Sequence, residues 1–208
     1  MWACVSKDCY LILRSEFFIL NLSAMSFLRS FFSHPHEVGA VAPSGKSYSE
    51  LTCRQVKWNQ VAVLVEIGAG DGAVTKYIVS HMKPEQVLVV FEINDQLFAK
   101  LKKKFNQANV ILIHDSAEHI EKYLKQYNLA QPDVIFSELP LVTLPVAITE
   151  NILQAVKRTL KRGGIFLQLS YSLVGKKRLQ AFFGQVKVRF TLFNIPPAFL
   201  YICQFVGN

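Results

Sequence analysis

Ten residues, 63–72 (VLVEIGAGDG), combine the residue types that a nucleotide-like ligand needs. They read as a buried β-strand that runs into a GxGxG turn at residues 68–72, with a helix behind it. Glycines at such a turn let the backbone approach a ligand and supply the φ freedom of a tight strand-to-helix connection. A second apolar strand, residues 87–91, ends in Glu92, where a βαβ unit can bind a ribose diol through paired hydrogen bonds. The two elements predict a site for a ligand that carries a ribose.

The spacing within this turn separates two classes of ligand. A dinucleotide fingerprint has the form GxGxxG, whereas this chain has GxGxG with an acid two residues before the first glycine. That form resembles the first motif of class I S-adenosylmethionine-dependent methyltransferases, in which the acid faces the amino group of the sulfonium ligand. The resemblance implies S-adenosylmethionine as the cofactor; the alternatives are a nicotinamide dinucleotide or a glycine-rich turn without a ligand. The residues expected to bind the cofactor here are Glu66, Gly68, Ala69, Gly70, Gly72, Glu92 and Ile93.

Strands and helices are expected to alternate along the chain, which is the pattern of a parallel sheet with helices on both faces. The last two strands read as an antiparallel pair, so we predict an α/β, Rossmann-like fold with a mixed seven-stranded sheet. The expected strands are residues 61–67, 87–91, 110–113, 133–137, 165–170, 185–193 and 199–205. A helix that ends near residue 57 precedes them, and helices 73–81, 96–105, one through 127 and one to 160 lie between them.

In such a sheet the ligand binds beyond the carboxyl ends of the strands. Those ends carry the glycine turn, Asp115 with Ser116, residues 137–140 and Tyr171. Because each follows a different strand, one edge of the sheet can gather them. We expect Asp115 to accept a hydrogen bond from the adenine amino group, the backbone of Ser116 to lie at the ring edge, and Ser137 to border the cofactor. The alternative for Asp115 is an N-cap of the following helix.

Composition favours one packed domain and bears on its partners. The chain has 208 residues, of which 51% are hydrophobic and 18% charged, and this excludes a largely disordered protein. Lys plus Arg exceed Asp plus Glu by eight, which favours an anionic partner such as a membrane surface or a nucleic acid. Four scattered cysteines indicate reduced thiols of a cytosolic protein and predict no metal site. No apolar run approaches the roughly 20 residues that span a bilayer.

The first 34 residues read as a separate helical segment ahead of a domain of residues 35–208. Apolar residues from Leu13 to Phe32 recur at spacings of three and four, which places them on one helical face before Pro35. This amphipathic helix could dock on its own domain, or it could lie in a membrane interface with its Phe and Leu side chains at the acyl boundary. Met25 also allows residues 1–24 to be an upstream extension.

Five motifs beyond the glycine turn resemble those of bacterial soluble phospholipid N-methyltransferases, from about residue 27 to the C-terminus. The resemblance implies stepwise methylation of phosphatidylethanolamine toward phosphatidylcholine by a cytoplasmic enzyme held peripherally on the anionic inner face of the membrane. One departure is Glu138, because the family usually has a small residue at this place in its Ser-x-Leu-Pro turn. The motifs are residues 27–29 (FLR), 38–44 (VGAVAPS), 137–145 (SELPLVTLP), 163–171 (GGIFLQLSY) and 194–198 (NIPPA).

Methylation of an amine needs a proton acceptor and a surface for a cation. A methyl sulfonium is already activated, so alignment of the nucleophile and exclusion of water are the main tasks. A phosphatidylethanolamine amine is protonated at neutral pH and must lose a proton before attack; Glu138, Tyr171 or a water could receive it. A ring face can hold the methylated head group by cation–π attraction, for which Tyr171 is the first candidate and Tyr48 the second.

The main alternative acceptor is RNA, because rRNA adenine dimethyltransferases have a similar cofactor half. In those enzymes an Asn-Leu-Pro-Tyr motif follows the fourth strand; its Asn accepts from the target amine and its aromatic ring stacks on the flipped base. Ser137 and Leu141 stand at these positions here and cannot do the same work, so a nucleic acid is not the expected partner. A module that binds S-adenosylmethionine without catalysis is the remaining alternative.

Overall fold

The computed structural model describes residues 45–192 and 197–206, which all belong to one compact unit, Val41–Asn208. The predicted amphipathic helix of residues 1–34 lies outside the described residues, as does most of the 194–198 motif. Among the helices of the described part, none is both long enough and apolar enough to cross a membrane.

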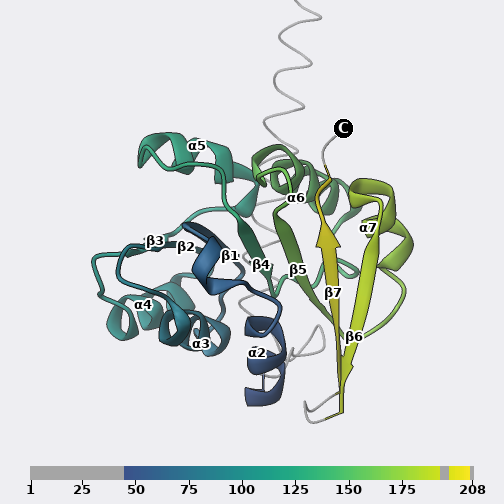
Figure 1. Ribbon diagram of the computed structural model, residues 1–208, viewed down its shortest axis with the longest axis horizontal. Helices are drawn as coiled ribbons and strands as arrows, with labels where there is room; N and C mark the ends of the chain where they lie inside the picture. Colours follow the sequence, from purple (N-terminus) through teal and green to yellow (C-terminus); the bar gives the residue numbers. More distant parts are fainter. Residues whose placement is uncertain (1–44, 193–196, 207–208) are drawn as a thin grey trace, which may run out of the picture. The chain divides into compact units, whose positions relative to one another are not determined.

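Seven strands form one mixed sheet in the order β3-β2-β1-β4-β5-β7-β6 (Figure 1). The neighbouring pairs from β3 to β5 are parallel, whereas β7 is antiparallel to both β5 and β6. The predicted Rossmann-like fold with a mixed seven-stranded sheet is therefore confirmed. The strands are β1 (Val63–Ile67), β2 (Val87–Phe91), β3 (Val110–Ile113), β4 (Val134–Ser137), β5 (Ile165–Ser170), β6 (Val186–Thr191) and β7 (Ala198–Gln204).

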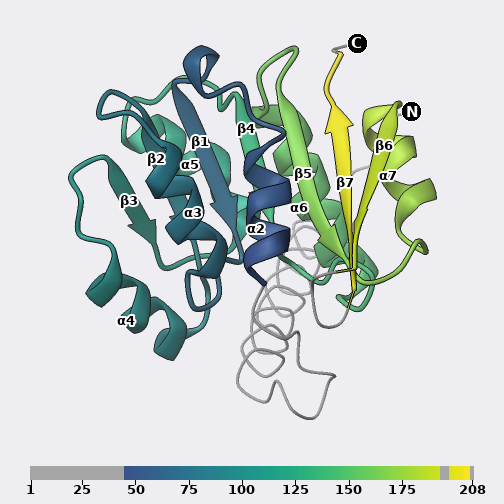
Figure 2. The same cartoon turned by 60° about the horizontal axis from the view of Figure 1, so that its bottom comes forward.

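Helices cover both faces of this sheet, with α2 and α3 in front of it and α5 and α6 behind it in Figure 2. α2 packs on α3 and also contacts β7 and β6, while α6 packs between α5 and α7 on the other face. The helices are α2 (Lys46–Cys53), α3 (Ala73–His81), α4 (Asp95–Lys104), α5 (Ile120–Gln126), α6 (Val146–Thr159) and α7 (Lys176–Phe183), with 3-10 turns η1 (Trp58–Gln60) and η2 (Ala117–His119).

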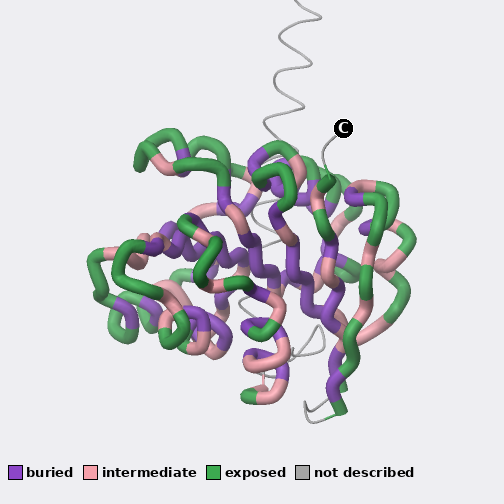
Figure 3. Tube along the Cα trace, viewed as in Figure 1, coloured by how far each residue is buried: buried purple, intermediate pink, exposed green. Residues whose placement is uncertain are grey.

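The central strands are buried because helices cover both of their faces (Figure 3). All of β1 is buried, and β2 is buried apart from its first residue, Val87. Their sequences, VLVEI and VLVVF, are the near-continuous apolar runs that buried parallel strands require. Glu66 interrupts the first run, although its relative exposure is 0%. A carboxyl group in this position opposes folding unless it has a partner, and it therefore marks a site.

Two helices differ from the sequence-based expectation. α2 ends at Cys53 rather than near residue 57, because the Trp58 indole N–H donates to the Cys53 carbonyl oxygen at 3.1 Å and satisfies an acceptor at the end of the helix. Helix α7 was not predicted, since this eight-residue helix buries only Leu179 and Phe183, which are too few positions for a helical period to be visible in the sequence.

Strand register aligns the carboxyl ends of the parallel strands. Ile67 at the end of β1 lies beside Phe91 of β2 and Ser137 of β4, and Ser137 lies beside Gln168 of β5. The loops that follow these strands therefore leave the sheet at one edge, called the carboxyl edge below. This is the edge at which an open α/β sheet binds its ligands.

Candidate functional site

Backbone hydrogen bonds tie the glycine turn after β1 to the end of β2. The N–H groups of Gly68 and Ala69 donate to the Phe91 carbonyl oxygen at 2.9 and 3.2 Å. The N–H of Gly70 donates to Glu92 Oε2 at 2.8 Å. All three glycines of the turn have positive φ angles, between 60° and 87°, which favour glycine strongly over other residues. The turn and the predicted ribose acid thus form one connected unit.

The space around each glycine shows why none of the three carries a side chain. A Cβ at Gly68 would lie 2.5 Å from Leu139 Cδ2, and one at Gly72 would lie 2.6 Å from Phe105 Cε2. Those two glycines permit close packing of the turn against neighbouring segments. A Cβ at Gly70 would meet no described atom within 4 Å. The backbone at Gly70 is therefore open on the side from which a ligand can approach.

Glu92 is buried, and the backbone holds its carboxylate in place. Its relative exposure is 2%, and its Oε1 accepts from the Asn94 N–H at 2.8 Å while Oε2 accepts from Gly70. Desolvation raises the pKa of Glu92, and the N–H groups of Asn94 and Gly70 act against this rise. Asn94 also caps α4 through Gln96 and Leu97. Asn94 was not among the predicted site residues, although an Asn directly before a helix is a recognisable N-cap signal.

Glu66 lies on the face of β1 that α2 and α3 cover. Within the described residues, neither oxygen of its carboxyl group has a hydrogen-bond partner that meets ordinary geometry. Burial raises the pKa of Glu66 well above its ordinary value, and the neighbouring Glu138 raises it further, while nearby Thr75 acts in the opposite direction. Burial and Glu66 also raise the pKa of the Cys53 thiol to about 12. A cation placed here would relieve the unfavourable environment of the Glu66 carboxylate.

The three predicted acceptor-side residues come from different elements, and one of them, Glu138, lies near Glu66. Tyr48 belongs to α2, Glu138 follows β4 and Tyr171 follows β5. Desolvation is the largest cause of the raised pKa of Tyr48, and charges at Glu138 and Tyr171 raise it further, which places the three side chains close to one another. Tyr48 is 1% exposed, whereas Tyr171 and Glu138 are only partly buried. We call Glu66, Glu138, Tyr48 and Tyr171 the acid–tyrosine cluster.

The turn after β4 is fixed to the end of β5. Ser137 is buried, and its hydroxyl accepts from the Leu139 N–H at 3.4 Å. The Gln168 side-chain amide donates to the Leu139 carbonyl oxygen at 2.8 Å. The Glu138 N–H donates to the Ile67 carbonyl oxygen at 3.1 Å, which joins the same turn to β1. Gln168, which was not among the predicted site residues, thus helps to hold the backbone beside Glu138.

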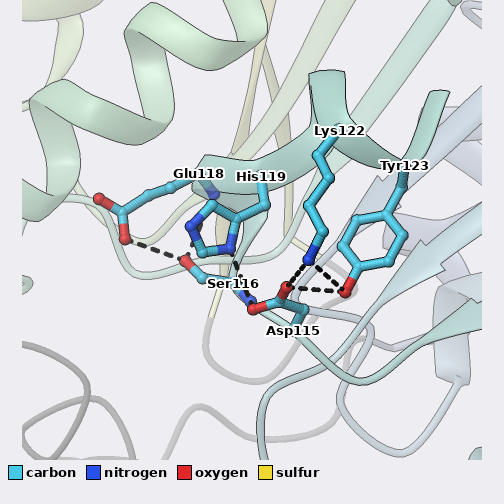
Figure 4. A network of polar contacts seen from close by, with 6 residues as sticks. All are labelled: Asp115, Ser116, Glu118, His119, Lys122 and Tyr123. Carbon is cyan, nitrogen blue, oxygen red and sulfur yellow. Dashed lines mark hydrogen bonds and ion pairs between the residues drawn. The ribbon is translucent and has the colours of Figure 1, made fainter. Parts of the chain in front are cut away.

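Asp115, after β3, is the centre of a polar network (Figure 4). Its carboxylate accepts from the Tyr123 hydroxyl at 2.7 Å, from the Ser116 N–H at 2.7 Å and from His119 Nδ1 at 3.0 Å, and Lys122 Nζ lies 3.6 Å away. Desolvation acts to raise the pKa of Asp115, but hydrogen bonds, that of Tyr123 first, outweigh it and lower the pKa.

The residues around Asp115 lie after β2 and β3, and one alternative for Asp115 is excluded. The N-cap of η2 is Ser116, whose hydroxyl accepts from the Glu118 N–H at 3.3 Å, so capping is not the role of Asp115. Ile93, between Glu92 and Asn94, is half-buried, and its carbonyl oxygen lies 3.0 Å from His114 Nε2. Ile93 and Asp115 thus follow adjacent strands at the carboxyl edge, where an adenine ring is expected.

The described cysteines and acids do not form a metal centre. No group of three or more His, Cys, Asp or Glu side chains in the described ranges is arranged to hold a metal ion. Burial raises the pKa of the Cys203 thiol to about 12, as it does for Cys53. A thiol with such a pKa is protonated at neutral pH and is a poor nucleophile or ligand.

The arrangement as a whole has two halves at one edge of the sheet. In the first half, the glycine turn has an open backbone and Glu92 is the acid expected to bind a ribose. Ile93 and Asp115 lie where the adenine ring is expected. Glu66 can become negatively charged when a cation binds beside it, and the rings of the acid–tyrosine cluster have faces that suit cationic groups. Such a site can hold a nucleoside ligand with a charged tail next to an amine.

Comparison with known proteins agrees with this arrangement. Residues 64–164 match a family model described as a methyltransferase domain. The chain is also 31% identical over 180 residues to an ornithine lipid N-methyltransferase of Singulisphaera acidiphila, and the match covers 86% of this chain and 94% of that protein.

Two solved structures show the same fold at low sequence identity. A precorrin-6y C5,15-methyltransferase from Geobacter metallireducens GS-15 has a TM-score of 0.60 and 20% identity, covering 77% of this chain and 88% of that chain. A T. thermophilus 16S rRNA N2 G1207 methyltransferase, solved in complex with AdoMet and guanosine, has a TM-score of 0.59 and 17% identity, covering 82% of this chain and 45% of that chain.

Proposed function

This chain belongs to the class I S-adenosylmethionine-dependent methyltransferases, and we propose that it methylates the amine of a lipid head group. The proposed acceptor is phosphatidylethanolamine or its mono- and dimethyl derivatives, at the inner face of the cytoplasmic membrane. The observation that carries the proposal is the acid–tyrosine cluster, which groups carboxyl groups with aromatic rings. Its Glu138 precedes Leu139, the residue that packs against Gly68 of the glycine turn. The lipid N-methyltransferase relative supports a lipid as the molecule that bears the amine.

S-adenosylmethionine fits the cofactor half of the site residue by residue. The backbone at Gly70 is open where a ligand must pass, and Glu92 lies behind it to accept from the ribose hydroxyls. The buried Glu66 carboxylate suits the α-amino group, and Asp115 with Ile93 borders the adenine. The bound cofactor supplies an activated methyl group on a sulfonium. The environment of Glu66 supports this assignment, since a cationic group would favour its carboxylate form and no cation of a described residue pairs with it.

The acceptor half contains groups for each task that methylation of an amine imposes. The amine must lose its proton before it attacks, and we assign Glu138 as the acceptor of that proton because one of its oxygens is buried and it lies near both tyrosines. Tyr171 is partly exposed, so its ring face can contact the growing quaternary ammonium. Tyr48, on α2, is fully buried and lies close to Glu138. Exclusion of water and alignment of the amine with the methyl group account for the remaining rate enhancement.

Glu138 also separates this chain from the typical phospholipid enzymes, which have a small residue there. A carboxylate in this turn increases the negative charge around the amine and favours a primary or partly methylated ammonium over a neutral acceptor. Ornithine lipid carries an amine too, and it is the acceptor in the name of the relative. The acceptor test therefore has to include both lipids.

The test is incubation of the full chain with radiolabelled S-adenosylmethionine and, separately, phosphatidylethanolamine, ornithine lipid and ribosomal RNA. We expect label in mono-, di- and trimethylated phosphatidylethanolamine after chromatography. A Glu92→Ala variant serves as the control for transfer that depends on the cofactor site. Label in ornithine lipid alone would replace the proposed acceptor by that lipid. Label in RNA alone, or in none of the three, would overturn the proposal of a lipid methyltransferase.

A further inference from the structure

Exposed apolar side chains gather at the carboxyl edge of the sheet. Val146 begins α6 and is 56% exposed, and Leu173 and Val174 follow β5 with exposures of 53% and 76%. Of the large hydrophobic residues that are exposed in the described ranges, Tyr127 and Val206 lie at the opposite edge, because α5 and β7 end there. We define the docking rim as the exposed apolar residues of the carboxyl edge: Val142, Val146, Leu173, Val174, Phe190 and Leu192.

The rim adjoins the acceptor half of the site. Tyr171 of the acid–tyrosine cluster is two residues before Leu173 in the same loop. A Cβ at Gly175 would lie 3.3 Å from Val142 Cγ2, so the loop after β5 contacts the loop that carries Glu138. On the other side of β5, Ser170 lies beside Phe199 of β7, and Phe199 lies beside Phe190 of β6. A surface that covers the rim therefore also reaches the acceptor site.

The loop that presents Leu173 and Val174 has a fixed base. The Ser172 carbonyl oxygen accepts from the Ser170 hydroxyl at 2.8 Å and from the hydroxyl of the buried Tyr201 at 2.7 Å. The Lys176 N–H closes a turn on the Leu173 carbonyl oxygen at 3.2 Å. These hydrogen bonds hold the backbone on both sides of the two apolar side chains and leave the side chains in solvent.

A cluster of positive charge follows the two apolar residues directly. Lys176, Lys177 and Arg178 form the first turn of α7, and none of them makes an ion pair with a described residue. Cations at a helix N-terminus oppose the helix dipole, so their position does not serve the helix. The sequence after Glu150 contains nine Lys and Arg residues and no Asp or Glu. Five of these cations belong to α7 and β6, and α7, β6 and β7 contain no Asp or Glu.

We propose that the docking rim, with Leu173 and Val174 at its tip and Lys176, Lys177 and Arg178 behind them, binds the surface of an anionic lipid bilayer. The apolar tip enters the boundary of the acyl region while the cations meet anionic head groups. Charge complementarity selects this occupant. The apolar tip lies beside cations that pair with no acid of the described residues, and an anionic bilayer has both an apolar interior and a negatively charged surface. The proposal rests on the proposed function, in which the acceptor amine lies in such a surface.

Contact between the docking rim and a bilayer would bring the acceptor half of the site to the lipid head groups, so that no lipid has to leave the bilayer. Glu138 and Tyr171 lie on the two loops that also carry Val142 and Leu173, so a bilayer against the rim presents its head groups to the acid–tyrosine cluster. Glu150 is the one acid of α6 and is exposed one turn after Val146. Removal of its charge should strengthen binding to the bilayer slightly.

The test measures co-sedimentation of the full chain with vesicles of phosphatidylglycerol and phosphatidylcholine, without cofactor or an amine lipid. The double variant Leu173→Ser with Val174→Ser should bind about tenfold more weakly, from the loss of apolar burial. The variant Lys176→Gln with Lys177→Gln should also lose about tenfold at low salt, and the difference should shrink as salt is raised. Matched controls at the opposite edge are Val206→Ser with Tyr127→Ser and Lys57→Gln with Lys83→Gln.

The outcomes separate this proposal from its competitors. Equal binding of the rim variants and the wild type overturns it. A fall of several degrees in the melting temperature of the Leu173→Ser, Val174→Ser variant would show that another part of the chain covers the tip, and a dimer that this variant dissociates would assign the rim to a second copy; each result overturns the proposal. Methyl transfer to lipid in neutral detergent micelles is measured in parallel. If the wild type transfers no methyl group to lipid in these micelles but its binding to vesicles depends on the rim, the proposed function is contradicted and the docking proposal is not.

Discussion

The Gly70 N–H donates to Glu92 Oε2 at 2.8 Å, so the glycine turn of β1 and the acid at the end of β2 are joined across 22 positions of sequence. Oε1 of the same carboxylate accepts from the Asn94 N–H, so a backbone N–H group holds each of its two oxygens. The acid is thus oriented before any ligand arrives. Preorganisation of this kind reduces the entropy that binding must overcome.

The first prediction concerns the loss of this carboxylate. Glu92→Ala should weaken binding of S-adenosylhomocysteine by at least about tenfold, because charge-assisted hydrogen bonds to the ribose and to the Gly70 backbone are lost together. Titration calorimetry measures the effect, and the exposed Glu85→Ala is the matched control. An unchanged affinity would mean that the ribose lies elsewhere.

The second prediction separates the roles of the three glycines. Gly68→Ala and Gly72→Ala should lower the melting temperature, because the new Cβ atoms would lie 2.5 Å from Leu139 and 2.6 Å from Phe105. Gly70→Ala meets no neighbour and should lose only the roughly 1–3 kcal/mol of a strained backbone, yet it should weaken S-adenosylhomocysteine binding strongly. Thermal unfolding and calorimetry on the three variants test this. If Gly70→Ala lowered the melting temperature as much as the other two variants and still bound S-adenosylhomocysteine, the assignment of Gly70 to the ligand side would be wrong.

The third prediction follows from the raised pKa of Glu66. The folded chain holds the Glu66 proton more tightly than the unfolded chain, so this group makes stability fall as pH rises from the ordinary pKa of 4.5 toward the raised value. Glu66→Gln keeps the shape and cannot ionise. It should therefore raise the melting temperature at pH 8 relative to the wild type, with a gain that shrinks toward pH 4.5, while it weakens cofactor binding. Glu85→Gln is the control; a lower melting temperature of Glu66→Gln at every pH would contradict the prediction.

The fourth prediction tests the two acceptor-side roles. Glu138→Gln should lower kcat on the lipid amine by about 100-fold or more at pH 7 and leave affinity for S-adenosylhomocysteine close to that of the wild type. The deficit should diminish at higher pH, where the amine is deprotonated without help; a pH-independent deficit would indicate a purely structural role. Tyr171→Ala should reduce the later methylation steps more than the first one, whereas Tyr171→Phe, which keeps the ring, should not.

Much of this arrangement could be predicted because it depends on local sequence. The apolar runs that end in residues 68–72 and in Glu92 predict two buried strands and their loops, and the alternation of strands and helices predicts the sheet. α7 could not be predicted, since two buried residues make no periodic pattern. The roles of Gln168 and Tyr123 were also missed, because each makes a hydrogen bond to a residue that the fold brings near, Leu139 and Asp115 respectively. Asn94 was missed although its N-cap signal is local, because that signal does not indicate the contact with Glu92.

The sequence by itself determined the strand ends, and therefore which residues could face a cofactor. Tertiary structure alone decided that Tyr48, from a helix before the sheet, lies with Glu138 and Tyr171, and that Glu66 has a buried and unfavourable environment. The physical reason is that the hydrophobic period of a strand or helix and the residue types of a turn depend on neighbours within a few residues. Desolvation and charge interactions instead depend on what packs around a group, and those neighbours come from distant parts of the chain.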